Sequence, residues 1–284
     1  CNPHRARNVF ACVYLLTHYW WDFYLTGDNI SEPLLDIWEK THADAPDREY
    51  VRWLRQIGDA YPPEREFWLR ESVQMRGNWM RVGKAATALK EALASDIPEL
   101  EQDTPAYRYA LSILNVYLAE ARPTYPKMNQ EPDVDALTLL EEAGSMLYQN
   151  GDSFHASWVI REVCETCLRL GKQYRSLATY RSGQRDTLLA RSKELFERVQ
   201  GEAQRGIDDA VEIAQRQEDV LDLEIIANFY RVLADVSWEK DKDGAATAVY
   251  HALAIFTAYV WLGEEWDVYS LEFLGEQVER FLAW

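Results

Sequence analysis

The amino-acid sequence predicts an all-α fold built from antiparallel helix pairs. Apolar residues recur every three or four positions along most of the chain, which is the spacing of one helix face. No segment alternates apolar and polar residues for long enough to predict a strand. The 284 residues are 48% hydrophobic, which is enough for a continuous core in one large or two ordinary domains.

Residues 1–121 are predicted to form N-terminal helical repeats. Apolar residues at helical spacing define successive amphipathic helices, with Gly, Pro, Ser or Asp at their ends. Two clear examples run from Asn78 to Ala94 and from Ala106 to Ala121, the second preceded by Thr104-Pro105. Proline suits the first helical position because the N–H it lacks would have no helical partner there.

The densest aromatic cluster of the chain lies at the end of the first predicted helix, in the segment His18–Tyr24. These rings point to all sides of one helix, so some pack against a neighbouring element or form a contact site. Trp and Tyr dominate the energetics of protein contact surfaces. The candidates for partner binding in this cluster are Tyr19, Trp20, Trp21 and Tyr24.

The connection 122–132 holds three prolines and no apolar period, which predicts a division between two subregions. The second subregion, 133–284, begins with the most regular helix pair of the chain, Leu140–Gly171. A tight turn at Gly151-Asp152 joins the two helices of this pair. Small and large apolar residues alternate where these helices are expected to touch, at Gly144, Leu147, Tyr148, Ala156, Ile160 and Val163.

This pattern resembles a tetratricopeptide repeat, a helix pair of about 34 residues. The resemblance implies a tetratricopeptide-like α-α superhelix, because one repeat alone cannot bury its apolar face. It also implies a concave surface lined by the first helix of each pair, here at Glu141, Ser145 and Tyr148. Family members that grip a C-terminal carboxylate use Lys, Arg and Asn on that surface. The first helix here offers Glu142, Gln149 and Asn150 and has no Lys or Arg, so a basic protein or peptide partner is expected.

Helices are also predicted along the rest of the chain. Long polar helices fill Asp186–Gln217, and a second pair spans Val220–Glu239 and Gly244–Leu262. The final helix, Trp266–Trp284, is expected to cap the array, as an open helical array requires. In the second pair, the residues at tetratricopeptide offsets are Ala234, Ala246, Tyr250 and Leu253.

The last helix pair and the aromatic opening also resemble the C-terminal helical regions of bacterial STAND-type signalling ATPases. Those proteins join an NTPase module to a repeat array that senses a ligand or a partner. The ATPase motifs are absent from this sequence, so nucleotide binding is not implied. The resemblance implies a non-catalytic sensor or scaffold that contacts a protein, a peptide or another domain of its parent chain.

The formal net charge is -17, which argues against binding to phosphate backbones, and no nucleic-acid partner is expected. The least acidic stretch runs from Arg161 to Arg205. No run of about 18 apolar residues predicts a membrane span. The 4 cysteines are too few and too scattered for a disulfide framework, which favours a reducing, cytoplasmic setting. The alternative is an exported lipoprotein whose mature chain begins at Cys1.

No catalytic, cofactor-binding or metal-ligating residues are predicted. The chain lacks P-loop, GxGxxG, HExxH and GxSxG patterns. Cys164 and Cys167 would supply half of a zinc site, but a second close pair of ligands is missing, so they are interpreted as core residues. The alternative function is an all-α metal-dependent enzyme, terpene-synthase-like or glycosidase-like, with an aromatic and acidic pocket. Its candidate magnesium ligands are Asp208, Asp209 and Glu212.

Overall fold

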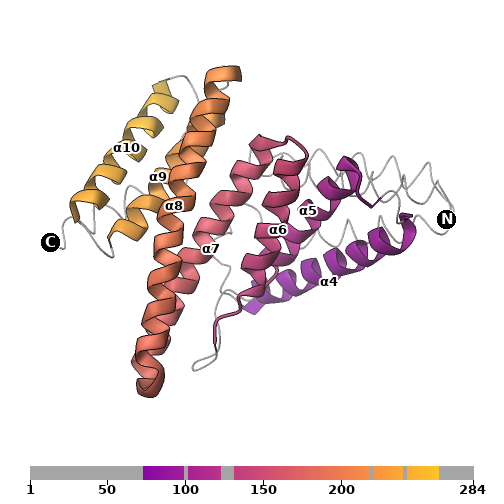
Figure 1. Ribbon diagram of the computed structural model, residues 1–284, viewed down its shortest axis with the longest axis horizontal. Helices are drawn as coiled ribbons and strands as arrows, with labels where there is room; N and C mark the ends of the chain where they lie inside the picture. The colour runs from indigo at the N-terminus through magenta and orange to yellow at the C-terminus, as the bar shows by residue number, and fades with distance from the viewer. Residues whose placement is uncertain (1–72, 99–101, 123–130, 218–220, 239–241, 262–284) are drawn as a thin grey trace. The chain divides into compact units, whose positions relative to one another are not determined.

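Every element of regular structure among the described residues is a helix, which confirms the all-α prediction. The computed structural model describes residues 73–98, 102–122, 131–217, 221–238 and 242–261. The elements in these ranges are α4 (Val73–Asp96), α5 (Pro105–Glu120), α6 (Asp135–Gln149), α7 (Ser153–Tyr180), the short 3₁₀-helix η3 (Ser182–Gln184), α8 (Arg185–Gln217), α9 (Leu221–Ser237) and α10 (Lys242–Trp261) (Figure 1). The helices predicted before Val73 and the capping helix predicted at Trp266–Trp284 lie outside the described residues.

The chain divides into two units, Cys1–Tyr125 with Thr138–Gly151, and Pro126–Leu137 with Asp152–Trp284. The first contains α4, α5 and nearly all of α6, and the second contains α7 to α10. The predicted division at 122–132 stays a prediction, because most of that connection lies outside the described residues.

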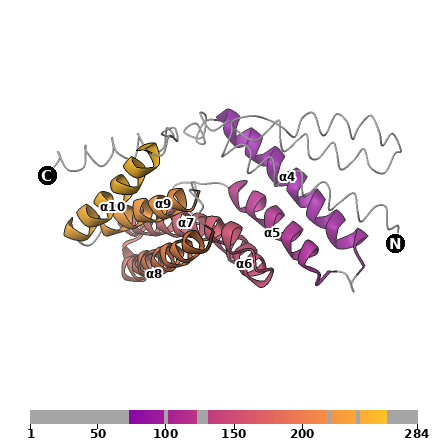
Figure 2. The same cartoon turned by 90° about the horizontal axis from the view of Figure 1, so that it is seen from above.

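In the first unit, α4 packs against α5 (Figure 2). Both helices bury apolar side chains. The start of α5 follows the sequence signal, since the hydroxyl of Thr104 accepts a hydrogen bond from the backbone N–H of Tyr107 and Pro105 is the first helical residue. This cap satisfies one of the N–H groups that a helix start leaves without a helical partner. The fully buried side chains of these two helices include Val82, Leu89, Leu93, Ile113, Leu114 and Tyr117.

The predicted turn between α6 and α7 is present, and each of its two residues has a distinct task. Gly151 has a φ of 75°, a conformation that residues with a Cβ seldom adopt. The Asp152 carboxylate then accepts a hydrogen bond from the backbone N–H of His155 at 3.1 Å and so caps α7. Its other oxygen lies 2.8 Å from Nδ1 of His155.

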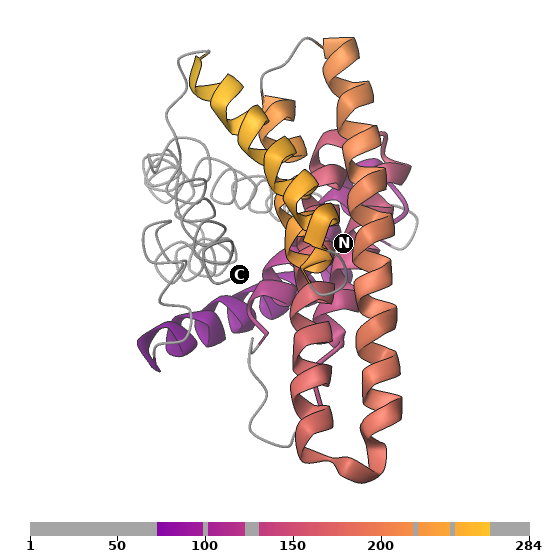
Figure 3. The same cartoon turned by 90° about the vertical axis from the view of Figure 1, so that its left-hand side faces the viewer.

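The second unit is organised around a long hairpin of α7 and α8, joined by η3 (Figure 3). The sequence predicts that the first of these helices ends near Gly171, but α7 continues to Tyr180. The glycine serves close packing instead of ending the helix. A Cβ added at Gly171 would lie 2.5 Å from Cε1 of Phe196 on α8. The hydroxyl of Ser192, one turn before Phe196, donates to the backbone carbonyl of Gly171 at 2.8 Å.

A second glycine–phenylalanine contact joins α8 to α9. The region predicted as several polar helices is one helix of 33 residues, α8. Within it, Gly206 faces the ring of Phe229 on α9, which occupies the space that a Cβ at Gly206 would need. Both Phe196 and Phe229 are almost completely buried. Two glycine–phenylalanine contacts therefore set the spacing of α7, α8 and α9.

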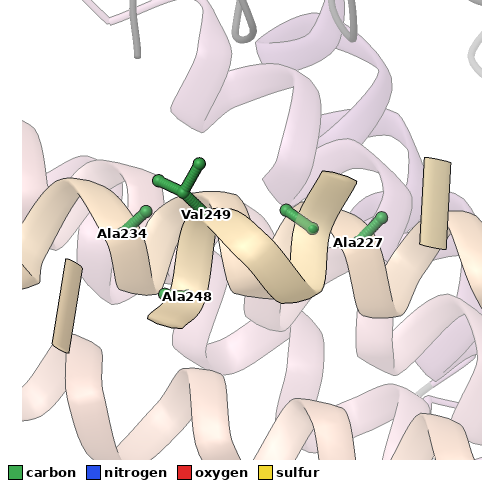
Figure 4. Packing of buried hydrophobic residues seen from close by; sticks show 5 residues of the cluster. Ala227, Ala234, Ala248 and Val249 are labelled. Carbon is green, nitrogen blue, oxygen red and sulfur yellow. The ribbon is translucent and has the colours of Figure 1, made fainter. Parts of the chain in front are cut away.

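The last pair, α9 and α10, packs through small side chains (Figure 4). Its buried cluster consists of Ala227, Ala234, Ala248, Val249 and Ala252. The sequence predicts that Ala246, Tyr250 and Leu253 lie in this contact, and for Tyr250 that is wrong, because its side chain is 69% exposed. The buried face of α10 lies one residue earlier, so Val249 takes the place expected for Tyr250.

Candidate functional site

The exposed face of α6 carries the site residues that the sequence predicts within the described ranges. Ser145 and Tyr148 are exposed, and Glu141 is half-buried. Tyr148 is 38% exposed, while the opposite face of α6 is buried. The predicted contact residues Tyr19, Trp20, Trp21 and Tyr24 lie outside the described residues.

A wider stripe surrounds these positions. Thr138, Glu142, Ser145 and Gln149 follow one another at three- and four-residue steps, and all are exposed. The amide of Gln149 donates to the hydroxyl of Ser145 at 3.4 Å. The opposite face of α6 is buried through Ala136, Leu137, Leu140, Ala143 and Leu147. The helix therefore presents a continuous polar and acidic strip with Tyr148 at its edge.

Glu142 is held in this strip by a ladder of hydrogen bonds across three helices. The Asn115 amide on α5 donates to Oε2 of Glu142 at 3.3 Å, and its carbonyl oxygen accepts from Nζ of Lys90 on α4 at 2.7 Å. Asn115 is fully buried, so the NH₂ group and the oxygen of its amide must both be hydrogen-bonded, because an unpaired buried polar group would lower stability. These hydrogen bonds fix the position of the exposed Glu142 carboxylate.

A second network anchors the end of the same helix. The amide of Asn150 donates to the backbone carbonyl of Pro105 at 2.8 Å, and its oxygen accepts from Nε of Arg108 at 2.9 Å. Nη1 of Arg108 also lies 2.6 Å from Oδ1 of Asp103. These bonds tie the C-terminal end of α6 to the start of α5 and so limit the motion of the strip.

Sequence reasoning identified Glu142 and Asn150 but missed Lys90, Arg108 and Asn115 as their partners. The signal for Asn115 was present, since an asparagine inside the apolar run Ala110–Ala119 requires hydrogen-bond partners when it is buried. Nothing in the sequence pattern identifies which helices supply those partners. Lys90 and Arg108 are therefore linked to α6 through Asn115 and Asn150, although α6 itself contains no Lys or Arg.

Cys164 and Cys167 are buried, free thiols on α7, in agreement with their interpretation as core residues. Burial raises the pKa of the Cys164 thiol, and Cys167, Glu202 and Glu165 raise it further. A thiol of this kind is protonated at neutral pH and is a poor nucleophile and metal ligand.

Charged side chains lie beside these thiols, and their partners come from the same unit. Arg161 is buried, with its guanidinium carbon 4.8 Å from the centroid of the Trp158 ring, and it is paired with Glu162. Glu165 on α7 is paired with Arg231 on α9. The Glu165–Arg231 pair connects α7 to α9, whereas Arg161 and Glu162 are neighbours on α7. Both pairs offset part of the cost of burying charge, so they provide a structural explanation of the cluster.

The residues of the alternative magnesium site follow one another along α8. Asp208 and Glu212 are exposed, and Oδ1 of Asp208 accepts a hydrogen bond from the amide of Gln204. Within the described ranges, no group of three or more His, Cys, Asp or Glu side chains is arranged to hold a metal ion. In the part of the chain that the structure describes, no feature favours the alternative enzyme, which stays a prediction.

Comparisons with known proteins returned no relationship: no protein-family model, no curated protein and no solved structure matches this chain. None of the helices in the described part of the chain is both long enough and apolar enough to cross a membrane.

Proposed function

We propose that the chain is a non-catalytic interaction module in which α6 presents a binding surface for a protein or peptide. In this proposal the helix pairs form a tetratricopeptide-like array, as the spacing around Gly151-Asp152 suggests. The module is the sensor or scaffold part of a larger bacterial signalling protein, which is what the resemblance to STAND-type ATPases implies. Its partner is a separate protein or another domain of the parent chain.

The observation that carries the proposal is the fixed, exposed strip on α6. Glu142 is positioned by Asn115 and Lys90, while Tyr148, six residues later on the same helix, is 38% exposed. A carboxylate held in place loses little side-chain freedom when a partner binds, so less binding energy is spent on ordering it. An exposed tyrosine supplies apolar area with a polar end, the combination enriched at contact hot spots.

The strip favours a basic partner. The sequence of α6 contains Asp135, Glu141 and Glu142 and has no Lys or Arg. A chain with net charge -17 also attracts cationic segments at long range. The long-range attraction accelerates the encounter with such a segment, whereas the fixed carboxylate and Tyr148 provide the specific contacts.

The test uses a fluorescein-labelled peptide of alternating Lys and Ala, with a Gln–Ala peptide as the uncharged reference. Fluorescence anisotropy at low ionic strength measures Kd for the whole chain. The paired substitution Glu141→Gln and Glu142→Gln should raise Kd about 3- to 10-fold, the range expected for losing two exposed charge contacts. Tyr148→Ala should raise Kd about 5- to 30-fold, as the loss of a hot-spot contact of about 1–2 kcal/mol requires.

Matched controls separate a built surface from general charge attraction. The pair Asp208→Asn and Glu212→Gln removes the same two charges from an exposed face of α8. Tyr250→Ala removes a ring that is more exposed than Tyr148, from α10. Both controls should change Kd less than about two-fold, within the usual effect of a rim position. Equal effects of the α6 variants and these controls would refute the proposal.

A further inference from the structure

The hairpin of α7 and α8 carries a concentration of positive charge that the rest of the chain does not share. Between Arg169 and Lys193 there are seven basic residues and one acidic residue, although the whole chain has net charge -17. The basic residues are Arg169, Lys172, Arg175, Arg181, Arg185, Arg191 and Lys193. The rest of the chain is therefore more acidic than its net charge suggests.

The fold places most of these charges at one end of the hairpin, here called the basic tip and defined as residues 172–193. Figures 1 and 3 both show this end of α7 and α8 extending beyond the ends of α9 and α10. Lys172, Arg185 and Lys193 are exposed, and Tyr180 is 59% exposed among them. Arginine and tyrosine are the residue types enriched where proteins contact one another.

Packing within the hairpin explains only part of this charge. Arg175 and Arg191 lie over the rings of Phe196 and Tyr174, and Lys193 pairs with Glu197. Arg185 is the first residue of α8, where a positive charge opposes the helix dipole. Among the described residues, neither Lys172 nor Arg185 has an ion partner. Like charges gathered at one end of a hairpin repel one another, so the cluster costs stability. A cluster that opposes stability is typical of a functional surface.

The tip already holds one carboxylate. Glu131, which precedes α6 in sequence, lies 3.7 Å from Nη1 of Arg181 and 4.0 Å from Nη1 of Arg191. The two arginines come from the end of α7 and the second turn of α8 and converge on one acidic group. The Glu131 side chain is half exposed, so the pair is weak and open to exchange with another carboxylate.

We propose that the basic tip is a docking surface for an acidic segment of another protein, and that Glu131 occupies part of it when the partner is absent. Asp and Glu side chains of the segment replace Glu131 at Arg181 and Arg191 and also reach Lys172 and Arg185. Tyr180 supplies an exposed ring for an apolar side chain of the segment. This surface differs from the strip on α6 in both position and charge, so its test does not depend on that proposal.

A protein segment fits these observations better than a nucleic acid. The tip converges on a carboxylate, and it belongs to a chain whose net charge of -17 repels an extended polyanion. At physiological salt such repulsion is screened within about 8 Å. A short acidic segment also carries less charge than a long duplex, so the acidic chain repels it less.

The test measures Kd for a fluorescein-labelled peptide of alternating Glu and Ala by anisotropy, again with the whole chain and with Gln–Ala as reference. The pair Lys172→Gln and Arg185→Gln should weaken binding about 3- to 10-fold. The control pair Arg81→Gln and Lys84→Gln removes the same charge from exposed positions on α4 and should change Kd less than two-fold, as expected of a rim position. Because the tip residues repel one another, the tip pair should keep or raise Tm.

Glu131 gives a second, opposite readout. Glu131→Gln removes the internal competitor and should tighten binding about two-fold or more, while Glu91→Gln, an exposed acid on α4, should leave Kd nearly unchanged. The proposal is overturned if the tip pair and the α4 pair have equal effects, or if Glu131→Gln does not tighten binding. It is also overturned if an oligonucleotide binds the tip more tightly than the acidic peptide, or if the tip variants abolish a self-association of the chain instead.

Discussion

Two glycines determine how closely the helices of the second unit approach one another. Gly171 and Gly206 each face a phenylalanine ring at a distance that leaves no room for a side chain. The sequence suggested that Gly171 ends a helix, because glycine is common just past helix ends. The structure shows the other use of glycine, which is to let a bulky group reach the backbone. The sequence around Gly171 does not distinguish these uses, since the ring that fills the space is 25 residues away.

The first prediction compares three Gly→Ala substitutions. Alanine favours an exposed helix position by about 0.5–1 kcal/mol over glycine. Gly201 on α8 is exposed with open space around it, so Gly201→Ala should raise the free energy of unfolding by about that amount. Gly171→Ala and Gly206→Ala should lower it by about 1–3 kcal/mol, because the phenyl rings must move. Urea unfolding followed by circular dichroism measures all three, and a uniform stabilisation would contradict the packing account.

The second prediction concerns the cap of α7. Asp152→Ala should lower the free energy of unfolding by about 0.5–2 kcal/mol, because the N–H of His155 loses its acceptor. Asp152→Asn keeps a capping oxygen and should cost much less. If the two variants were equally destabilised, the cap itself would not be the source of the stability.

The same residue gives a pH dependence. Partial burial acts to raise the pKa of Asp152, but its hydrogen bond and charge interaction with His155 outweigh burial, and the pKa is lowered. Its contribution to stability is therefore present above the unfolded-state pKa of about 3.9 and is lost as pH falls through the lower folded-state pKa. Asp152→Asn should remove this part of the acid dependence, as urea midpoints between neutral and acidic pH will show.

At the scale of the element, the pairing of α9 with α10 depends on small side chains. Alanines at the contact, shown in Figure 4, let two helix backbones come close, and Ala227, Ala234 and Ala252 are fully buried there. The periodicity of the sequence predicted both helices. It did not predict the buried face of α10, because Ala245, Ala246, Ala248, Val249, Tyr250 and Ala252 form a nearly continuous apolar run. Such a run has no clear polar side to fix its rotation.

The third prediction tests that rotation. Ala252→Leu places a large side chain in the fully buried contact and should lower the free energy of unfolding by about 1–3 kcal/mol. Ala254→Leu makes the same change at an exposed position of the same helix and should alter stability by less than about 0.5 kcal/mol. Thermal unfolding of the two variants compares them directly. If Ala254→Leu lowered the free energy of unfolding more than Ala252→Leu, the buried face of α10 would be the one that carries Ala254.

At the scale of the whole molecule, charge is segregated between surfaces. Composition predicts an acidic chain, and the sequence lacks the P-loop and GxGxxG patterns of nucleotide-binding enzymes. The strip on α6 was partly recoverable from sequence, because Glu141, Ser145 and Tyr148 follow helical spacing from a recognisable turn. The hydrogen bonds that hold Glu142 could not be predicted from the sequence, because packing between separate helices brings Lys90 and Asn115 to Glu142. Side-chain partners across helices depend on crossing geometry, which periodicity does not encode.

The fourth prediction separates the interaction module from the alternative metal-dependent enzyme. Magnesium at a hundred times its dissociation constant adds about 2.7 kcal/mol of stability to a protein that binds it only when folded. We expect no change in Tm on adding MgCl₂ beyond the change seen with NaCl of equal ionic strength. A magnesium-specific rise in Tm that disappears in Asp208→Asn would favour the enzyme instead.

The most direct test of the central claim is Kd for the Lys–Ala peptide in the wild-type chain, in Tyr148→Ala and in Tyr250→Ala. Neither substitution changes the charge, so long-range attraction is the same in all three proteins. The account predicts that Tyr148→Ala weakens binding about 5- to 30-fold and that Tyr250→Ala leaves it within about two-fold. Equal Kd values in the three proteins would show that the exposed face of α6 is not the binding surface.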